Sequence, residues 1–298
     1  MNLKLIDGVI ARYVDVLDEG DVRRLKFFRE LWGALDEGVH DMEEQSYALP
    51  SEKELERLLR EGRPVFSCDP APVDADALVR TAERLGDIAV ASGFFAGVIA
   101  DALERVKWDR VIAATDASLA GKDPVAWLED LSAVLVDDGM TEQAAHLSAL
   151  LASMALKAQL EKPASQVMRS LKRFGEEEHP LACPVCGSAP SLAHVGGDTS
   201  SAGRGRLLVC PQCAAAWEFD RVRCARCGTR NQAHLHFFNI EGDDAHRIAT
   251  CDECGGYIRT LYSDDALAPC SYEVEDVVMA RLDAIANDPA VAAKGREE

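Results

Sequence analysis

Eight regularly spaced cysteines carry most of the chemistry that this sequence can offer. They form four C-x-x-C pairs: Cys183 and Cys186, Cys210 and Cys213, Cys224 and Cys227, and Cys251 and Cys254. The last four follow the first four at a constant offset of 41 residues, and Arg206 recurs as Arg247 at the same offset. A repeat of this kind predicts one small supersecondary unit, C-x2-C-x23-C-x2-C, that the chain uses twice.

The spacing suits a tetrahedral metal ion with thiolate ligands at about 2.3 Å. One tight turn presents both sulfurs of a pair, and a second turn facing the first completes the cage. Gly187, Gly228 and Gly255 follow three of the pairs and permit the positive φ that such a turn needs. Ala214 stands at the equivalent place after the second pair, so we expect that turn to be distorted. Identical spacing favours one ion per repeat, while a crossed arrangement, with the outer pairs together and the inner pairs together, stays open.

Other thiol chemistries fit this pattern less well. Disulfides need an oxidising compartment, and thioredoxin-like exchange needs a C-x-x-C at a helix start beside a strand. The strand-like runs between the cysteines are short, and a structural tetrathiolate site would stabilise them by about 10 kcal/mol or more. The sequence therefore predicts two metal ions, and four sulfur ligands suit either zinc or a single iron at each site.

The other polar residues near the cysteines receive no ligand role. Each repeat already has four sulfurs, so we assign no function to the nearby histidines, which are His194, His234, His236 and His246. Four arginines crowd the junction between the repeats and either offset thiolate charge or form a solvated surface: Arg221, Arg223, Arg226 and Arg230. Cys68 and Cys270 lie outside the pairs, and we interpret them as a structural thiol and a spare thiol.

The chain before residue 178 has helical periodicity. Ser51 and Glu54 form a capping box at the start of an apolar stripe. Residues 75–106 predict one or two largely buried helices, interrupted near Gly93.

Two further helices are predicted in the remainder of the chain. One begins after a Thr141 cap and runs to about Lys162, where Pro163 is expected to end it. The other is a single amphipathic helix over residues 272–286.

These elements predict an α+β fold in four parts. They are a helical domain (1–178), a first metal module (179–220), a second metal module (221–268), and a C-terminal helix with a polar tail (269–298).

Composition limits the classes of partner. The 298 residues are 48% hydrophobic and 28% charged, which is enough to bury a core, and the net charge is −19. Nucleic-acid binding needs a basic surface, so we expect no nucleic-acid partner. No long apolar run predicts membrane insertion. Residues 1–21 carry Asp7, Arg12 and Asp15 and lack the pattern of a secretory signal, so we expect a cytoplasmic protein.

The cysteine motifs resemble those of the FdhE family of formate dehydrogenase accessory proteins. The similarity lies in CPVCGSAP, CPQC followed by Trp217, RVRCARCG and CDECGGYIRTLY, in this order, over about residues 181–262. The polar tail after residue 287 departs from the ending expected of the family. The resemblance implies a helical portion followed by two rubredoxin-like modules that bind iron, with zinc as the alternative.

The same resemblance implies a cytoplasmic maturation factor or chaperone. It would bind the catalytic subunit of a formate dehydrogenase and support its assembly or activation, without being an enzyme itself. The sequence shows no nucleophile elbow or phosphate-binding glycine loop. Two alternatives stay open: a zinc-ribbon interaction adaptor unrelated to formate metabolism, and a rubredoxin-type one-electron carrier.

Overall fold

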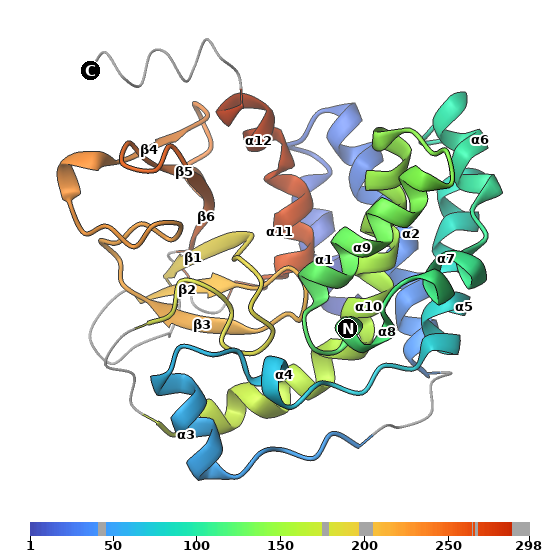
Figure 1. Ribbon diagram of the computed structural model, residues 1–298. Helices are drawn as coiled ribbons and strands as arrows, with labels where there is room; N and C mark the ends of the chain where they lie inside the picture. The colour runs from blue at the N-terminus through green and yellow to red at the C-terminus, as the bar shows by residue number, and fades with distance from the viewer. Residues whose placement is uncertain (41–45, 175–178, 197–204, 264, 266–267, 288–298) are drawn as a thin grey trace.

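The chain folds into a helical part and a six-stranded sheet that lie side by side (Figure 1). The computed structural model describes residues 1–40, 46–174, 179–196, 205–263, 265 and 268–287. The predicted α+β class is confirmed, with helices first, the cysteine-bearing strands next and short helices last. No helix within these described ranges is both long enough and apolar enough to span a bilayer.

Ten helices precede the sheet in the described part of the chain. Their bounds are α1 Leu3–Tyr13, α2 Glu19–His40, α3 Glu52–Arg60, α4 Val65–Cys68, α5 Ala75–Ala91, α6 Val98–Arg105, α7 Trp108–Ala114, α8 Ala117–Ala120, α9 Pro124–Asp137 and α10 Glu142–Leu171. The predicted caps are confirmed, because Ser51 and Thr141 accept backbone N–H groups three residues on. The interruption near Gly93, whose φ is +63°, separates α5 from α6.

The predicted end of α10 at Pro163 is wrong. The helix continues through this residue to Leu171. A proline inside a helix costs about 3 kcal/mol, because it removes one hydrogen bond and crowds the preceding turn. Leu160, Ala164 and Val167 around it are fully buried, and we attribute the continuation to the burial of this apolar face.

The two repeats share one sheet with the strand order β3-β2-β1-β6-β5-β4. The strands are β1 Leu192–Gly196, β2 Arg206–Val209, β3 Ala216–Phe219, β4 Leu235–Asn239, β5 His246–Cys251 and β6 Tyr257–Ser263, with a 3-10 turn η1 at Gln232–His234. Each repeat supplies three antiparallel strands, and the parallel pair β1–β6 joins them. Gly196 ends β1 opposite Ser263, where a Cβ would clash with the serine carbonyl oxygen. No pattern in the sequence predicts this joining pair.

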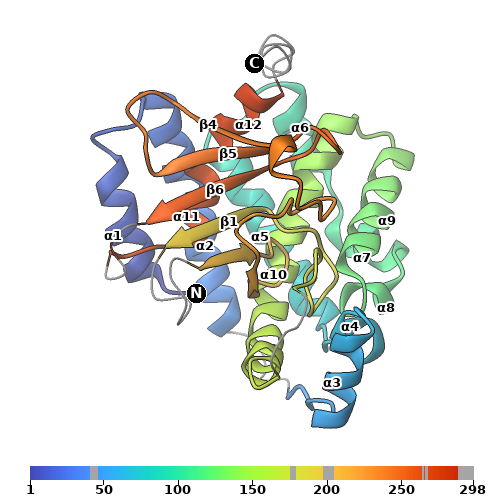
Figure 2. The same ribbon diagram turned by 90° about the vertical axis from the view of Figure 1, so that its left-hand side faces the viewer.

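Helices α11 Tyr272–Val278 and α12 Ala280–Ala286 cover one face of the sheet (Figure 2). The prediction of a single C-terminal helix needs this correction, since Met279 separates two short ones. A small apolar cluster lies under them, formed by Leu192, Val209, Ile248, Leu261, Met279 and Leu282. The two helices therefore fix the position of the second repeat.

The main hydrophobic core runs without a break from the helices into the first repeat. Phe66, Leu208 and Trp217 belong to one cluster of buried side chains. Trp217 also donates its indole N–H to the carbonyl of Pro180 at 2.9 Å. The predicted domain boundaries at 178, 220 and 268 stay predictions, but the first repeat shares its core with the helices.

A buried polar network ties α1 to the sheet and to α11. His246 is almost fully buried, with Asp243 on one ring nitrogen and Glu275 on the other, each at 2.9 Å. Tyr13 donates its hydroxyl to Glu275 at 2.8 Å, and Arg281 pairs with Asp243. Burial lowers the pKa of His246, but the two carboxylates outweigh it and raise the pKa to about 9. The imidazole is therefore charged in the folded protein at neutral pH.

We predict that this histidine makes folding stability depend on pH. A raised folded-state pKa gives stabilisation that is complete below the ordinary value of 6.5 and lost as the pH rises through about 9. The free energy of unfolding should fall by roughly 3 kcal/mol across that window. Denaturant unfolding of His246→Gln at several pH values should lack this decline. Exposed His236, replaced in the same way, is the control and should keep the wild-type profile.

Candidate metal centres

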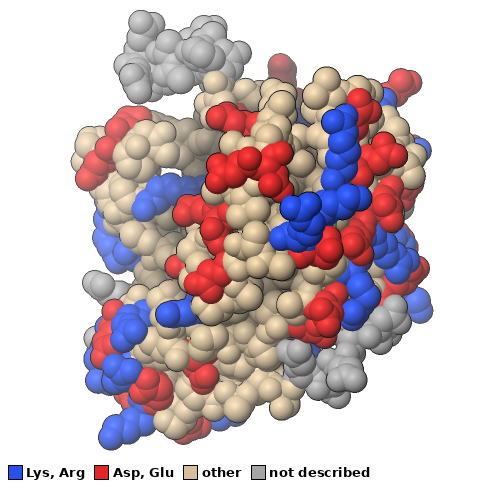
Figure 3. Space-filling view, turned by 45° about the vertical axis from the view of Figure 1, so that its right-hand side comes forward, with Lys and Arg blue, Asp and Glu red and all other residues tan. Residues whose placement is uncertain are grey.

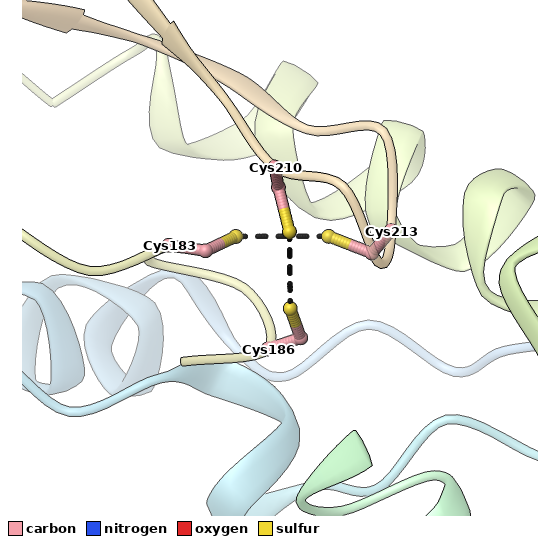
Figure 4. A group of neighbouring side chains, drawn as sticks. All are labelled: Cys183, Cys186, Cys210 and Cys213. Carbon is pink, nitrogen blue, oxygen red and sulfur yellow. Dashed lines mark hydrogen bonds between the residues drawn. The ribbon is translucent and has the colours of Figure 1, made fainter. Parts of the chain in front are cut away.

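The first group of cysteines comes together in the buried core (Figure 4). The Sγ atoms of Cys183 and Cys213 lie 3.6 Å apart, and those of Cys186 and Cys210 lie 3.4 Å apart. All four residues are buried, and their sulfurs lie within 4.8 Å of one another. The four side chains in Figure 4 point toward a common centre from two facing turns.

The second group has the same plan with a different exposure. Cys224 and Cys254 have sulfurs 3.8 Å apart, as do Cys227 and Cys251. Cys227 and Cys254 are exposed, whereas the other two are buried. The structure thus brings together the four cysteines of each repeat, and it does not form the crossed arrangement. The sequence repeat gave no sign of this difference in exposure.

The sulfur distances fit a metal ion better than a disulfide. Four ligands at about 2.3 Å from a tetrahedral ion are separated by about 3.8 Å. The observed S–S separations of 3.4 to 3.8 Å agree with that distance and far exceed the disulfide bond length of about 2.05 Å. All ten cysteines are free thiols in the structure. The residues present therefore fit one ion at each group, with iron and zinc both compatible.

Each turn is closed by the same backbone contact. The N–H of the first cysteine donates to the carbonyl five residues on, at 2.8 to 3.0 Å in all four turns. Gly187, Gly228 and Gly255 take positive φ values of +84°, +81° and +67°. The turn at Ala214 differs from the others in part. This alanine also adopts a positive φ, of +58°, and the contact from Cys210 to Ala215 is kept, whereas the N–H groups of the three glycines make a second bond, to the carbonyl of the first cysteine of their turn. The turn is kept at a steric cost of about 1 kcal/mol.

The helical part holds the first group directly. The N–H groups of Val65 and Phe66 in α4 donate to the carbonyls of Pro184 and Val185 between the first two cysteines. Gln212, between the next two, exchanges hydrogen bonds with the side chain and carbonyl of Ser153 in α10. Helices that are distant in sequence therefore set the position of both turns.

Burial and hydrogen-bond donors shift the pKa values of the cysteines in opposite directions. Burial raises the pKa of Cys183 and Cys213 well above the ordinary thiol value. Hydrogen bonds from neighbouring thiols lower the pKa of Cys186. In the second group, burial raises the pKa of Cys224, but the backbone N–H groups of Cys227 and Arg226 donate to its sulfur and favour the thiolate. The net effect lowers the pKa of Cys224 to about 7. Backbone donors aimed at sulfur favour the thiolate form that a metal ion needs.

The remaining polar residues have structural contacts of their own. His194 contacts the Tyr272 hydroxyl at 3.0 Å, and His236 pairs with Asp252 at 2.8 Å. Arg223 and Arg230 both pair with Asp220. Cys68 is exposed and lies outside both groups, and Cys270 is half-buried.

Comparison with known proteins agrees with these centres. The family model described as "FdhE, central domain" matches residues 182–221, which include the first group of cysteines. Over this part of its length the chain is similar to proteins of the FdhE family. It is 34% identical over 103 residues to a protein named FdhE homolog from Aquifex aeolicus, covering 34% of this chain and 35% of the relative. It is 40% identical over 83 residues to one from Shewanella, covering 27% and 26%.

The chain thus spans about a third of the length of the curated FdhE relatives that it matches. A crystal structure of the FdhE protein from Pseudomonas aeruginosa aligns with 98% of this chain and 89% of that chain. The TM-score is 0.48 at 20% identity.

We predict that a chelator removes the two ions at different rates. The exposed Cys227 and Cys254 let competing ligands reach the second centre, while the first centre is closed on all sides. Timed chelation followed by metal analysis should show one ion leaving early and the other only with unfolding. The Cys68→Ala variant is the control and should release both ions as the wild type does. Simultaneous loss of both ions would contradict the prediction.

The turn glycines generate a second prediction. Ala214→Gly should raise the free energy of unfolding by up to about 1 kcal/mol, because glycine adopts a positive φ without strain. Gly187→Ala should lower it by more than 1 kcal/mol, because the new Cβ would also lie 3.0 Å from Cγ of Pro64. Denaturant unfolding of both metal-loaded variants beside the wild type measures the two shifts. Equal effects of the same sign would count against this account.

Proposed function

We propose that this protein is a cytoplasmic accessory factor for a formate dehydrogenase. It binds the catalytic subunit of that enzyme and supports its assembly or activation, without catalysing formate oxidation itself. The observation that carries the proposal is the FdhE central-domain match, which falls on the first group of cysteines. The four sulfurs of that group lie in the core, where a bound ion fixes the turns rather than meeting a substrate.

The eight cysteines hold two ions in this proposal, and iron is favoured by the family resemblance. The ligands are Cys183, Cys186, Cys210 and Cys213 at the first centre and Cys224, Cys227, Cys251 and Cys254 at the second. A tetrathiolate iron would supply one-electron chemistry, whereas zinc would be structural only. Elemental analysis and a visible spectrum of protein purified without oxidants distinguish the two. Colourless protein with two zinc ions would favour the adaptor alternative.

The surface is compatible with a protein client. The net charge of −19 favours basic or partly folded segments of a partner. Acidic and basic side chains are interspersed over the face in Figure 3, so this face has no single charged patch. The exposed side of the second centre is the part of the metal modules that a client can touch directly.

One observation favours the electron-carrier alternative as a second candidate. The exposed Cys227 and Cys254 would let an electron reach an iron at the second centre, whose ferric form becomes ferrous on accepting one electron. Bleaching by dithionite and recovery in air, confined to one of two irons, would support this role. Protein whose colour does not respond would exclude it.

Co-purification tests the accessory role. Tagged wild-type protein should recover the catalytic subunit of a formate dehydrogenase from its own cells. The double variant Cys227→Ala, Cys254→Ala should recover several-fold less, because it removes the exposed ligands without opening the core. Cys68→Ala replaces an exposed cysteine outside both centres and serves as the matched control. Failure of the wild type to recover any such subunit would sink the proposal.

A further inference from the structure

One face of the sheet is turned away from α11 and α12 (Figure 2). This face carries a cavity at the junction of the two repeats. Its volume is about 490 Å³, within the range of small-molecule sites. Val195 of β1 and Tyr262 of β6, which are paired in the sheet, lie in its floor. The segment from Arg221 to Arg226 forms another wall.

The lining of this cavity is basic on a strongly acidic protein. Four of the described lining residues are arginines, namely Arg206, Arg221, Arg223 and Arg226, and none is aspartate or glutamate. Only Arg223 among them makes an ion pair within the described residues, with Asp220. In a chain with 51 acidic and 32 basic residues, the arginines of this lining reverse the overall charge locally, and they face Cys224 and Cys251 of the second cysteine group, which also line the cavity.

Arg206 is the most informative of these side chains. It is 7% exposed, its Nε has no hydrogen-bond partner, and one terminal nitrogen donates to the carbonyl of Arg223 at 3.0 Å. A buried guanidinium without a carboxylate is costly, because burial penalises the charged form. An anion that enters the cavity would relieve this cost and accept the free N–H groups.

The repeat places a second arginine beside the same cavity. Arg247 is the counterpart of Arg206 in the second repeat, and its Nε is likewise buried without a partner. Its guanidinium lies 4.2 Å from the ring centre of Tyr262 and 5.2 Å from that of Phe237, two cavity-lining residues. The stacking holds the planar group in one orientation.

We propose that this cavity binds a phosphorylated small molecule that carries a planar ring. The guanidinium groups of Arg206 in the lining and of Arg247 beside it suit the oxygens of a phosphate, and Thr250 adds a hydroxyl donor in the lining. Phe237, whose side chain is 63% exposed, offers a face on which a ring can stack. The site adjoins the second cysteine group, because Cys224 and Cys251 also line the cavity.

Calorimetric titration of the metal-loaded full chain with pyrophosphate and with ADP tests the proposal. We expect both to bind, ADP more tightly, and both to weaken as salt is raised. Arg247→Gln should weaken both about tenfold. Phe237→Ala should weaken ADP more than pyrophosphate, because it removes the face for the ring as well as one of the two rings that orient Arg247.

Arg105→Gln removes the same charge from α6, where the side chain is exposed, and should leave both affinities unchanged. Arg206→Lys keeps the charge and removes the planar fork, so it should weaken both ligands. Arg247→Gln remains decisive if the buried Arg206 variant does not fold.

Three outcomes would overturn the proposal. The first is no binding of either probe at millimolar concentration in low salt, which would mean that the arginines only balance the thiolate charge of the second centre. The second is equal weakening by Arg247→Gln and Arg105→Gln, which would assign binding to overall charge. The third is binding of citrate in place of both phosphates, which would assign the site to carboxylates.

Discussion

The packing of four cysteine sulfurs at 3.4 to 3.6 Å inside an apolar core is the constraint on which the structure depends. Thiolates at so short a distance repel one another, and burial removes their hydration. Without a cation, the four cysteines would therefore favour moving apart. A divalent or trivalent ion turns the same arrangement into a source of folding energy. The backbone donors from α4 and the exchange between Gln212 and Ser153 hold the turns at that spacing.

The sheet connects the first repeat, which is held in the core, to the second repeat. Because β1 and β6 pair in parallel, the second repeat continues a sheet whose other half is packed on the helices. The apolar cluster that it shares with β1 and β2 is small and includes Met279 and Leu282 from the C-terminal helical segment. The charged network around His246 then links that half to α1. Two units of identical spacing thus acquire different surroundings, one closed and one open to solvent.

This difference separates the tasks that the two centres can perform. The closed centre belongs to the core and can act only by fixing its turns. The open centre presents Cys227 and Cys254 at the surface, and the arginine-lined cavity adjoins it. In the functions that we propose, contacts with a client or a small molecule fall on the second repeat and on its junction with the first. Arg206 and Arg247 occupy equivalent positions of the repeat, and the shared sheet places Arg206 in the cavity lining and Arg247 against its residues Phe237 and Tyr262.

The sequence by itself determined the local features. Cysteine spacing fixed which sulfurs share a turn, and Ser51 and Thr141 marked helix starts, because these effects act over a few residues. Tertiary structure decided the rest. Pro163 stayed within a helix and Ala214 took a left-handed turn, because surrounding contacts outweighed local preference. The parallel β1–β6 pair, the exposure of one centre and the charge of His246 arise between residues far apart in the chain, where no local pattern records them.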